Sequence, residues 1–76
     1  MTVTPRDIAE WRARGHPYLL IAAEMAEWAK DKPYGTRLPD DAEFTVAATP
    51  STYSRAKAFL VTNGVLAVGD GPHFVT

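Results

Sequence analysis

Two groups of side chains in this sequence could do acid–base or metal chemistry. The first is a carboxylate cluster of Asp40, Asp41 and Glu43, but acids are also favoured electrostatically in the first turn of a helix. The second is His16 and His73, which could titrate near neutral pH. The chain has no cysteine, and we find no nucleophile–base pair, glycine-rich phosphate loop or histidine–carboxylate metal spacing. We therefore expect no catalytic residue, metal or cofactor, and no enzyme.

A third group, hydroxyls and cations, could contact nucleic acid. Between Phe44 and Gly69 the only charged side chains are Arg55 and Lys57, and both are positive. The whole chain nevertheless has a net charge of −1, whereas nucleic-acid binders are usually basic because phosphate neutralisation supplies most of their non-specific affinity. If this protein binds DNA, its cations must be concentrated locally.

Length and composition predict one globular domain over residues 1–76. The chain has 76 residues, of which 46% are hydrophobic and 22% charged, which is too short for two cores and too apolar for a disordered segment. Its longest apolar run, residues 18–23, is far below the ~20 residues that span a membrane. No signal peptide is visible at the N-terminus, so we expect a soluble cytoplasmic protein.

Proline, glycine and threonine mark the first two helices that we expect. Thr4 can cap a helix that begins at Pro5 and ends at Gly15. A second helix should begin at Pro17 and end near Lys30, because its apolar side chains recur at the spacing of one buried helix face.

The middle of the chain predicts a turn, a short helix and a longer helix. Residues 33–35 read as a turn and residues 36–38 as a brief extended segment. Asp40 resembles an N-cap with Glu43 as its capping-box partner, which predicts a helix of about two turns through residues 44–47. The next helix should cover residues 50–62, with Thr52, Tyr53, Ala56, Phe59 and Leu60 facing the core and Ser51, Ser54, Arg55 and Ala58 facing outward.

The C-terminal residues read as a β-hairpin. Residues 65–68 and 73–75 favour strands, and the glycine-rich residues 69–72 between them favour a turn. The order of helix, short extended segment, short helix, helix and hairpin is that of a winged helix-turn-helix. We therefore expect a mainly α, α+β fold with an N-terminal helical extension over residues 1–15, three core helices and a two-stranded wing within residues 17–75.

Four stretches resemble the GntR-type winged helix-turn-helix transcriptional regulators. Residues 34–39, Y-G-T-R-L-P, look like the family phrase P-G-T-R-L-P, and residues 49–56, T-P-S-T-Y-S-R-A, resemble S-R-T-T-V-R-R-A. Residues 63–66, N-G-V-L, resemble E-G-L-V, and residues 71–75 resemble the wing ending G-x-T-F-V. The resemblance implies a sequence-specific double-stranded DNA-binding protein, usually a dimeric repressor, with helix 50–62 in the major groove and hairpin 65–75 as the wing. The chain ends directly after the wing, so we expect no small-molecule effector.

The resemblance and the chemistry of helix 50–62 together give a set of candidate DNA-contacting residues. They are Arg37, Ser51, Thr52, Ser54, Arg55, Lys57 and Gly71. Lys57 stands where the family has a core leucine, and it is included because its long side chain could reach a phosphate. The sequence departs from the family at four positions where basic residues are common, which are occupied here by Ala42, Pro50, Ser54 and Asp70.

Each basic candidate has an alternative interpretation. Arg55 could read guanine through a bidentate contact or be a solvated helix arginine. Arg37 could bind the DNA backbone or form an ion pair with Asp40 or Asp41. Lys57 could reach a phosphate or be a surface lysine. The hydroxyls of residues 51, 52 and 54 could contact DNA or serve only the start of the helix.

Two further questions stay open at the level of sequence. Ile8 and Trp11 could form a homodimer face or pack onto their own core. The alternative function is a winged-helix protein-interaction module, or a recombination accessory factor, with weak DNA affinity. The acidic balance and the missing arginines favour this alternative, whereas the acid-free outer face of helix 50–62 favours a DNA-binding regulator.

Overall fold

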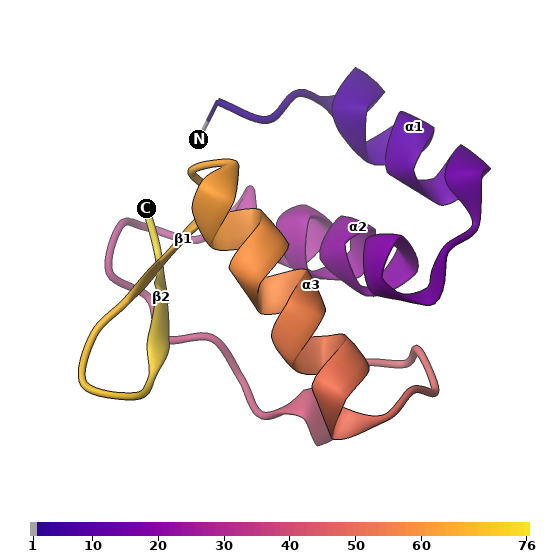
Figure 1. Ribbon diagram of the computed structural model, residues 1–76. Coiled ribbons are helices and arrows are strands. Elements are labelled where there is room, and N and C mark those ends of the chain that lie inside the picture. The colour runs from indigo at the N-terminus through magenta and orange to yellow at the C-terminus, as the bar shows by residue number, and fades with distance from the viewer. Residues whose placement is uncertain (1) are drawn as a thin grey trace.

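A computed structural model describes residues 2–76 and has a mainly helical α+β fold (Figure 1). The elements follow in the order α1 (Pro5–Arg14), α2 (Pro17–Ala29), the 3₁₀ turn η1 (Asp41–Glu43), α3 (Pro50–Thr62), β1 (Leu66–Val68) and β2 (His73–Val75). Helix α3 crosses in front of α2, α1 lies along one end of the molecule, and the β-hairpin lies beside the C-terminal half of α3 (Figure 1).

The ends of α1 and α2 follow from their capping residues. The Thr4 side chain accepts a hydrogen bond from the backbone N–H of Asp7, and the Asp7 carboxylate accepts one from the Thr4 N–H, which completes a capping box. Gly15 ends α1 in the left-handed conformation, with φ 73°, where glycine has no Cβ penalty. Both helices carry proline in the first turn, so the predicted helices over residues 5–14 and 17–30 are confirmed.

Helix α2 forms the centre of a single hydrophobic core. Seven of its side chains are buried, and they are Leu19, Ile21, Ala22, Ala23, Met25, Ala26 and Ala29. The alanines are small enough for α1 and α3 to pack closely against α2 from different directions. Tyr53, Ala56 and Leu60 form the inner face of α3, which confirms three of the five core positions predicted there, while Thr52 and Phe59 are only partly buried.

Ile8 and Trp11 pack onto the core of their own chain. Ile8 is 2% exposed and Trp11 is 8% exposed. The Trp11 ring meets Phe59 of α3 edge to face, with ring centroids 5.0 Å apart. In the structure of the single chain, both side chains therefore pack as the intrachain alternative expects.

The prediction of a two-turn helix through residues 44–47 is wrong. Asp40 makes no side-chain capping hydrogen bond, and after the single turn η1 the chain is extended at Phe44, with φ −99° and ψ 151°. Tertiary hydrogen bonds hold the following residues in this conformation. The Glu24 carboxylate accepts bonds from the N–H and the hydroxyl of Thr45, both at 2.8 Å, and the Tyr53 hydroxyl donates to the Val46 carbonyl at 2.6 Å. These bonds outweigh the weak helix propensity of the Thr and Val residues, so only two core helices remain of the three expected.

The predicted hairpin is present and carries a third extended segment. Strands β1 and β2 are antiparallel, with Leu66 opposite Val75. Arg37 forms a β-bridge with Phe74 on the other side of β2, and backbone hydrogen bonds join Leu38 to His73 and Val75 to Thr36. The extended segment 36–38 therefore fixes Arg37 to the hairpin. Within residues 2–76, no helix combines the length and the apolar character needed to cross a membrane.

Trp11 gives a test of the intrachain packing. We expect Trp11→Ala to lower the free energy of unfolding by about 3–5 kcal/mol, the usual cost of removing a large buried aromatic side chain. Urea denaturation followed by far-UV circular dichroism measures this loss. We also expect the wild-type midpoint to be the same at low and high protein concentration. A stable Trp11→Ala variant, or a midpoint that rises with concentration, would show that Trp11 lies in a dimer interface instead.

Candidate nucleic-acid interface

The outer face of α3 is polar and free of acids. Ser51, Ser54, Arg55 and Ala58 are exposed, as the sequence predicts, while Lys57 lies at the edge of the buried face. A helix with this surface offers hydroxyl and guanidinium groups to a partner and no apolar docking stripe.

The first turn of α3 explains part of its hydroxyl content. Thr49 caps the helix by accepting a hydrogen bond from the Thr52 N–H. Its hydroxyl also lies 3.1 Å from that of Ser51 and 3.0 Å from that of Thr52. Ser51 and Thr52 therefore take part in helix-start chemistry, as their alternative interpretation states, and Ser51 remains exposed beside the helix N-terminus. Ser54 lies one turn further along the outer face.

Arg55 is held in place by an aromatic ring. Its guanidinium carbon lies 4.0 Å from the centroid of the Tyr18 ring, in the first turn of α2. Tyr18 is itself packed edge to face against Phe59 and stacked on His16. A guanidinium stacked on an aromatic face keeps its N–H donors in the plane of the group, where they can still form a bidentate contact. The spacing of apolar residues along α2 predicts only a core role for Tyr18. Because Arg55 lies far from Tyr18 in the sequence, no local pattern indicates the contact between them.

Lys57 is paired with a carboxylate. Its Nζ lies 2.6 Å from Oδ1 of Asp41, and the two side chains are 20% and 37% exposed. The ammonium group is therefore neither the free phosphate ligand nor the simple surface lysine considered from the sequence. The ion-pair alternative for Arg37 is not realised within residues 2–76, since Asp41 pairs with Lys57 and Arg37 is exposed.

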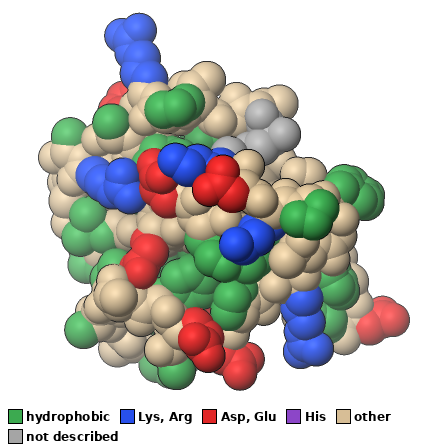
Figure 2. All heavy atoms as spheres, turned by 180° about the vertical axis from the view of Figure 1, so that it is seen from behind, with side chains coloured by type: hydrophobic (Ala, Val, Ile, Leu, Met, Phe, Trp, Pro, Cys, Tyr) green, Lys and Arg blue, Asp and Glu red, His purple; other side chains and the backbone are tan. Residues whose placement is uncertain are grey.

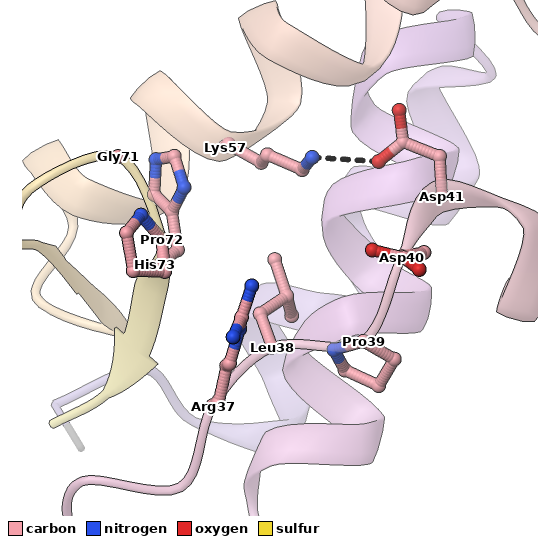
Figure 3. A pocket seen from close by; sticks show the side chains of 9 residues that line it. All are labelled: Arg37, Leu38, Pro39, Asp40, Asp41, Lys57, Gly71, Pro72 and His73. Atoms are coloured by element: carbon pink, nitrogen blue, oxygen red, sulfur yellow. Dashed lines mark hydrogen bonds and ion pairs between the residues drawn. The ribbon is translucent and has the colours of Figure 1, made fainter.

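One open depression brings several of these groups together (Figure 3). It is lined by residues 37–41, Lys57 and residues 71–73. Lys57 and Asp41 point toward each other across one side of it, with Arg37 and His73 on the other (Figure 3). Gly71 adopts φ 106° in the hairpin turn, a conformation that glycine adopts without strain. Of the predicted contact residues, Arg37, Lys57 and Gly71 share this depression, whereas the α3 residues 51, 54 and 55 do not line it.

His73 lines the depression and has a lowered pKa. Partial burial lowers the pKa of its imidazole below the ordinary value of 6.5, and the nearby positive charge of Lys57 lowers it further. Both effects favour the neutral ring. The sequence gives no sign of this, because the strand that carries His73 and the helix that carries Lys57 meet only in the folded chain.

The cations of α1 and α2 are largely neutralised. Glu27 pairs with Lys30 at 2.8 Å and with Arg12 at 3.6 Å, and Arg14 lies 3.9 Å from Glu10. Figure 2 shows the molecule from behind, with basic and acidic side chains interspersed on that face. That face therefore lacks the single-sign field that attracts a polyanion. In the part of the chain that the structure describes, no group of three or more His, Cys, Asp or Glu side chains could hold a metal ion.

Comparison with known proteins adds no relative: no protein-family model, curated protein or solved structure matches this chain. The resemblance to GntR-type regulators therefore depends on the four stretches of residues described above. The structural features that bear on function are α3, the hairpin and the depression lined by residues 37–41, Lys57 and residues 71–73.

His73 gives a pH dependence with a definite sign. Because its folded-state pKa is lowered, the unfolded chain binds more protons, so the stability contribution is full above pH 6.5 and is lost as the pH falls through the folded-state pKa. We expect the free energy of unfolding to decrease from about pH 8 to about pH 5 more steeply in the wild type than in His73→Gln. Urea titrations across this range measure both profiles, and parallel profiles would contradict the assignment.

Proposed function

We propose that this protein is a sequence-specific double-stranded DNA-binding regulator of the winged helix-turn-helix type, acting as a cytoplasmic repressor. Helix α3 would enter the major groove, and the β1–β2 hairpin would be the wing. The observation that carries the proposal is the acid-free outer face of α3, on which the exposed Arg55 guanidinium lies over the Tyr18 ring. No small-molecule effector is part of the proposal.

The dimensions and chemistry of α3 suit a major groove. An α-helix with its side chains is about 10–12 Å wide, and the groove is about 12 Å wide. Arg55 can form two hydrogen bonds with guanine, and serine hydroxyls can bond either base edges or phosphates. Ser51 and Ser54 lie on the same outer face as Arg55. This face therefore combines one strong base-reading group with short polar groups that permit close approach.

The hairpin and segment 36–38 would flank the groove. Arg37 is exposed and is bonded through its backbone segment to β2, and the hairpin turn borders the same depression as Lys57 of α3. Figure 1 shows the hairpin beside α3. A cation carried by the sheet is suited to a phosphate next to the groove, because phosphate contacts fix the orientation of the protein on the duplex.

A homodimer on a two-fold operator would need a surface other than Ile8 and Trp11. Both are buried in the core of their own chain. Binding by a single copy would depend on few cationic contacts, mainly Arg37 and Arg55, so we expect moderate affinity that falls strongly with salt.

A second candidate function is a protein-interaction module, and one observation favours it. The extended residues after η1 border a shallow groove whose lining is mostly apolar, with Phe44, Val46, Ala47, Ala48 and Tyr53. A recombination accessory factor would use the same DNA-binding surface as the repressor and differ only in the process that it serves. DNA titration separates the protein-interaction module from both of these.

Fluorescence anisotropy with a labelled random-sequence duplex tests the proposal. We expect binding whose logarithmic dependence on salt between ~50 and ~200 mM has a slope of about −2 to −3, from two or three phosphate contacts per chain. Arg55→Ala should lose about 1–3 kcal/mol of binding free energy on a duplex selected from the bound pool, and should relax specificity at one base pair.

Arg6→Ala is the matched control, because Arg6 is an exposed cation on α1, away from α3. It removes the same charge and should leave affinity for the selected duplex nearly unchanged. The absence of binding at low salt would refute the DNA-binding function and favour the protein-interaction module. Equal losses for Arg55→Ala and Arg6→Ala would refute the role of Arg55.

A further inference from the structure

Lys57 belongs to the helix that would contact DNA, yet its ammonium group forms an ion pair with Asp41 of the same chain. The ammonium group lies 2.6 Å from Asp41, which is within hydrogen-bonding distance, and both partners are charged. The lysine side chain is only 20% exposed, so the pair is better shielded from solvent than an ordinary surface salt bridge. Lys57 is also one of the two cations between Phe44 and Gly69, so this pairing halves the free positive charge of that stretch.

The turn that carries Asp41 is built to hold the carboxylate in this position. Backbone hydrogen bonds run from the Glu43 N–H to the Asp40 carbonyl and from the Phe44 N–H to the Asp41 carbonyl. Glu24 and Tyr53 then hold the residues that follow. The backbone around Asp41 is therefore held by hydrogen bonds other than the ion pair, so it does not have to be ordered by Lys57.

Carboxylate and phosphate oxygens are alternative acceptors for the same ammonium group. Arg55 and Lys57 are two residues apart on α3, so they leave the helix on different sides. Arg55 turns toward Tyr18, and Lys57 turns toward the depression that it shares with Arg37 and the hairpin (Figure 3). A phosphate that approached Lys57 from the depression would meet an ammonium group already paired with Asp41, so the two anions would compete for the same positive charge.

We propose that Asp41 is a specificity-determining residue, which competes with DNA phosphate for Lys57. On random DNA the Asp41 carboxylate stays paired with the Lys57 ammonium group. On a sequence that Arg55 reads, the duplex is held close enough for a backbone phosphate to take the place of Asp41. This inference rests on the proposed DNA-binding function. Within that function, the Asp41 carboxylate keeps the affinity for non-specific DNA low.

Asp41→Asn tests the competition because it removes the charge at nearly constant size. We expect this full-length variant to bind a random duplex about threefold to tenfold more tightly at ~50 mM salt, with a salt slope steeper by about one, since one more phosphate is neutralised. Far-UV circular dichroism checks that each variant is folded, and Asp41→Ser replaces Asp41→Asn if the latter does not fold.

Two further variants separate competition for Lys57 from a general charge effect. Glu43→Gln is the matched control, because Glu43 is an exposed acid of the same turn. It should give a smaller gain and no change of salt slope. The double variant Asp41→Asn with Lys57→Gln should lose the gain of Asp41→Asn, because the gain depends on the released lysine.

The results distinguish failure of this inference from failure of the proposed function. If neither the wild type nor Asp41→Asn binds DNA at low salt, the DNA-binding function itself is wrong. The inference alone is overturned if the wild type binds and Asp41→Asn does not gain affinity. It is also overturned if Glu43→Gln gains equally or if the gain persists without Lys57.

Discussion

The burial of α2 is the constraint on which the other elements depend. Its side chains are buried on several faces, and four of the seven buried residues are alanines. Small side chains let α1 and α3 approach α2 closely, and a helix buried in this way fixes the directions of the helices around it. Because a domain of this size buries a limited fraction of its surface, Trp11 and Phe59 of the neighbouring helices are also needed in the core. The inner face of α3 packs in the core, so its polar face is the one exposed to solvent.

Two polar residues of α2 connect this buried helix to the candidate interface. Tyr18 supports Arg55 at the start of the helix, and Glu24 anchors Thr45 from its middle. One Glu24 oxygen accepts both hydrogen bonds from Thr45, whereas the other is buried and has no partner among the described residues. An unsatisfied buried polar atom is unfavourable, so the bonds to Thr45 must offset it. The bonds from Glu24 and Tyr53 hold Thr45 and Val46, which follow the turn that carries Asp41.

Patterns of neighbouring residues predict those helices and strands whose ends are set by short-range interactions such as capping and turn formation. Thr4, Gly15 and Thr49 mark helix ends through capping, and the glycine-rich turn at residues 69–72 marks the hairpin. Residues 44–47 were mispredicted because bonds from distant residues override a capping-box pattern there. The pairs Arg55–Tyr18 and Lys57–Asp41 join residues far apart in the chain, and the helix spacing carries no sign of either. The sequence thus predicts which cations α3 carries, but not which of them is paired with a carboxylate.

The central claim is that α3 and the hairpin form a DNA-binding surface. The most direct test is a two-dimensional ¹H–¹⁵N nuclear magnetic resonance titration of the full chain with an unlabelled random duplex at low salt. We expect chemical-shift changes at Ser51, Ser54 and Arg55 and at Gly71 of the hairpin turn, with little change in the α1 residues around Ile8. Changes confined to α1 or to residues 44–48, or no changes at all, would contradict it.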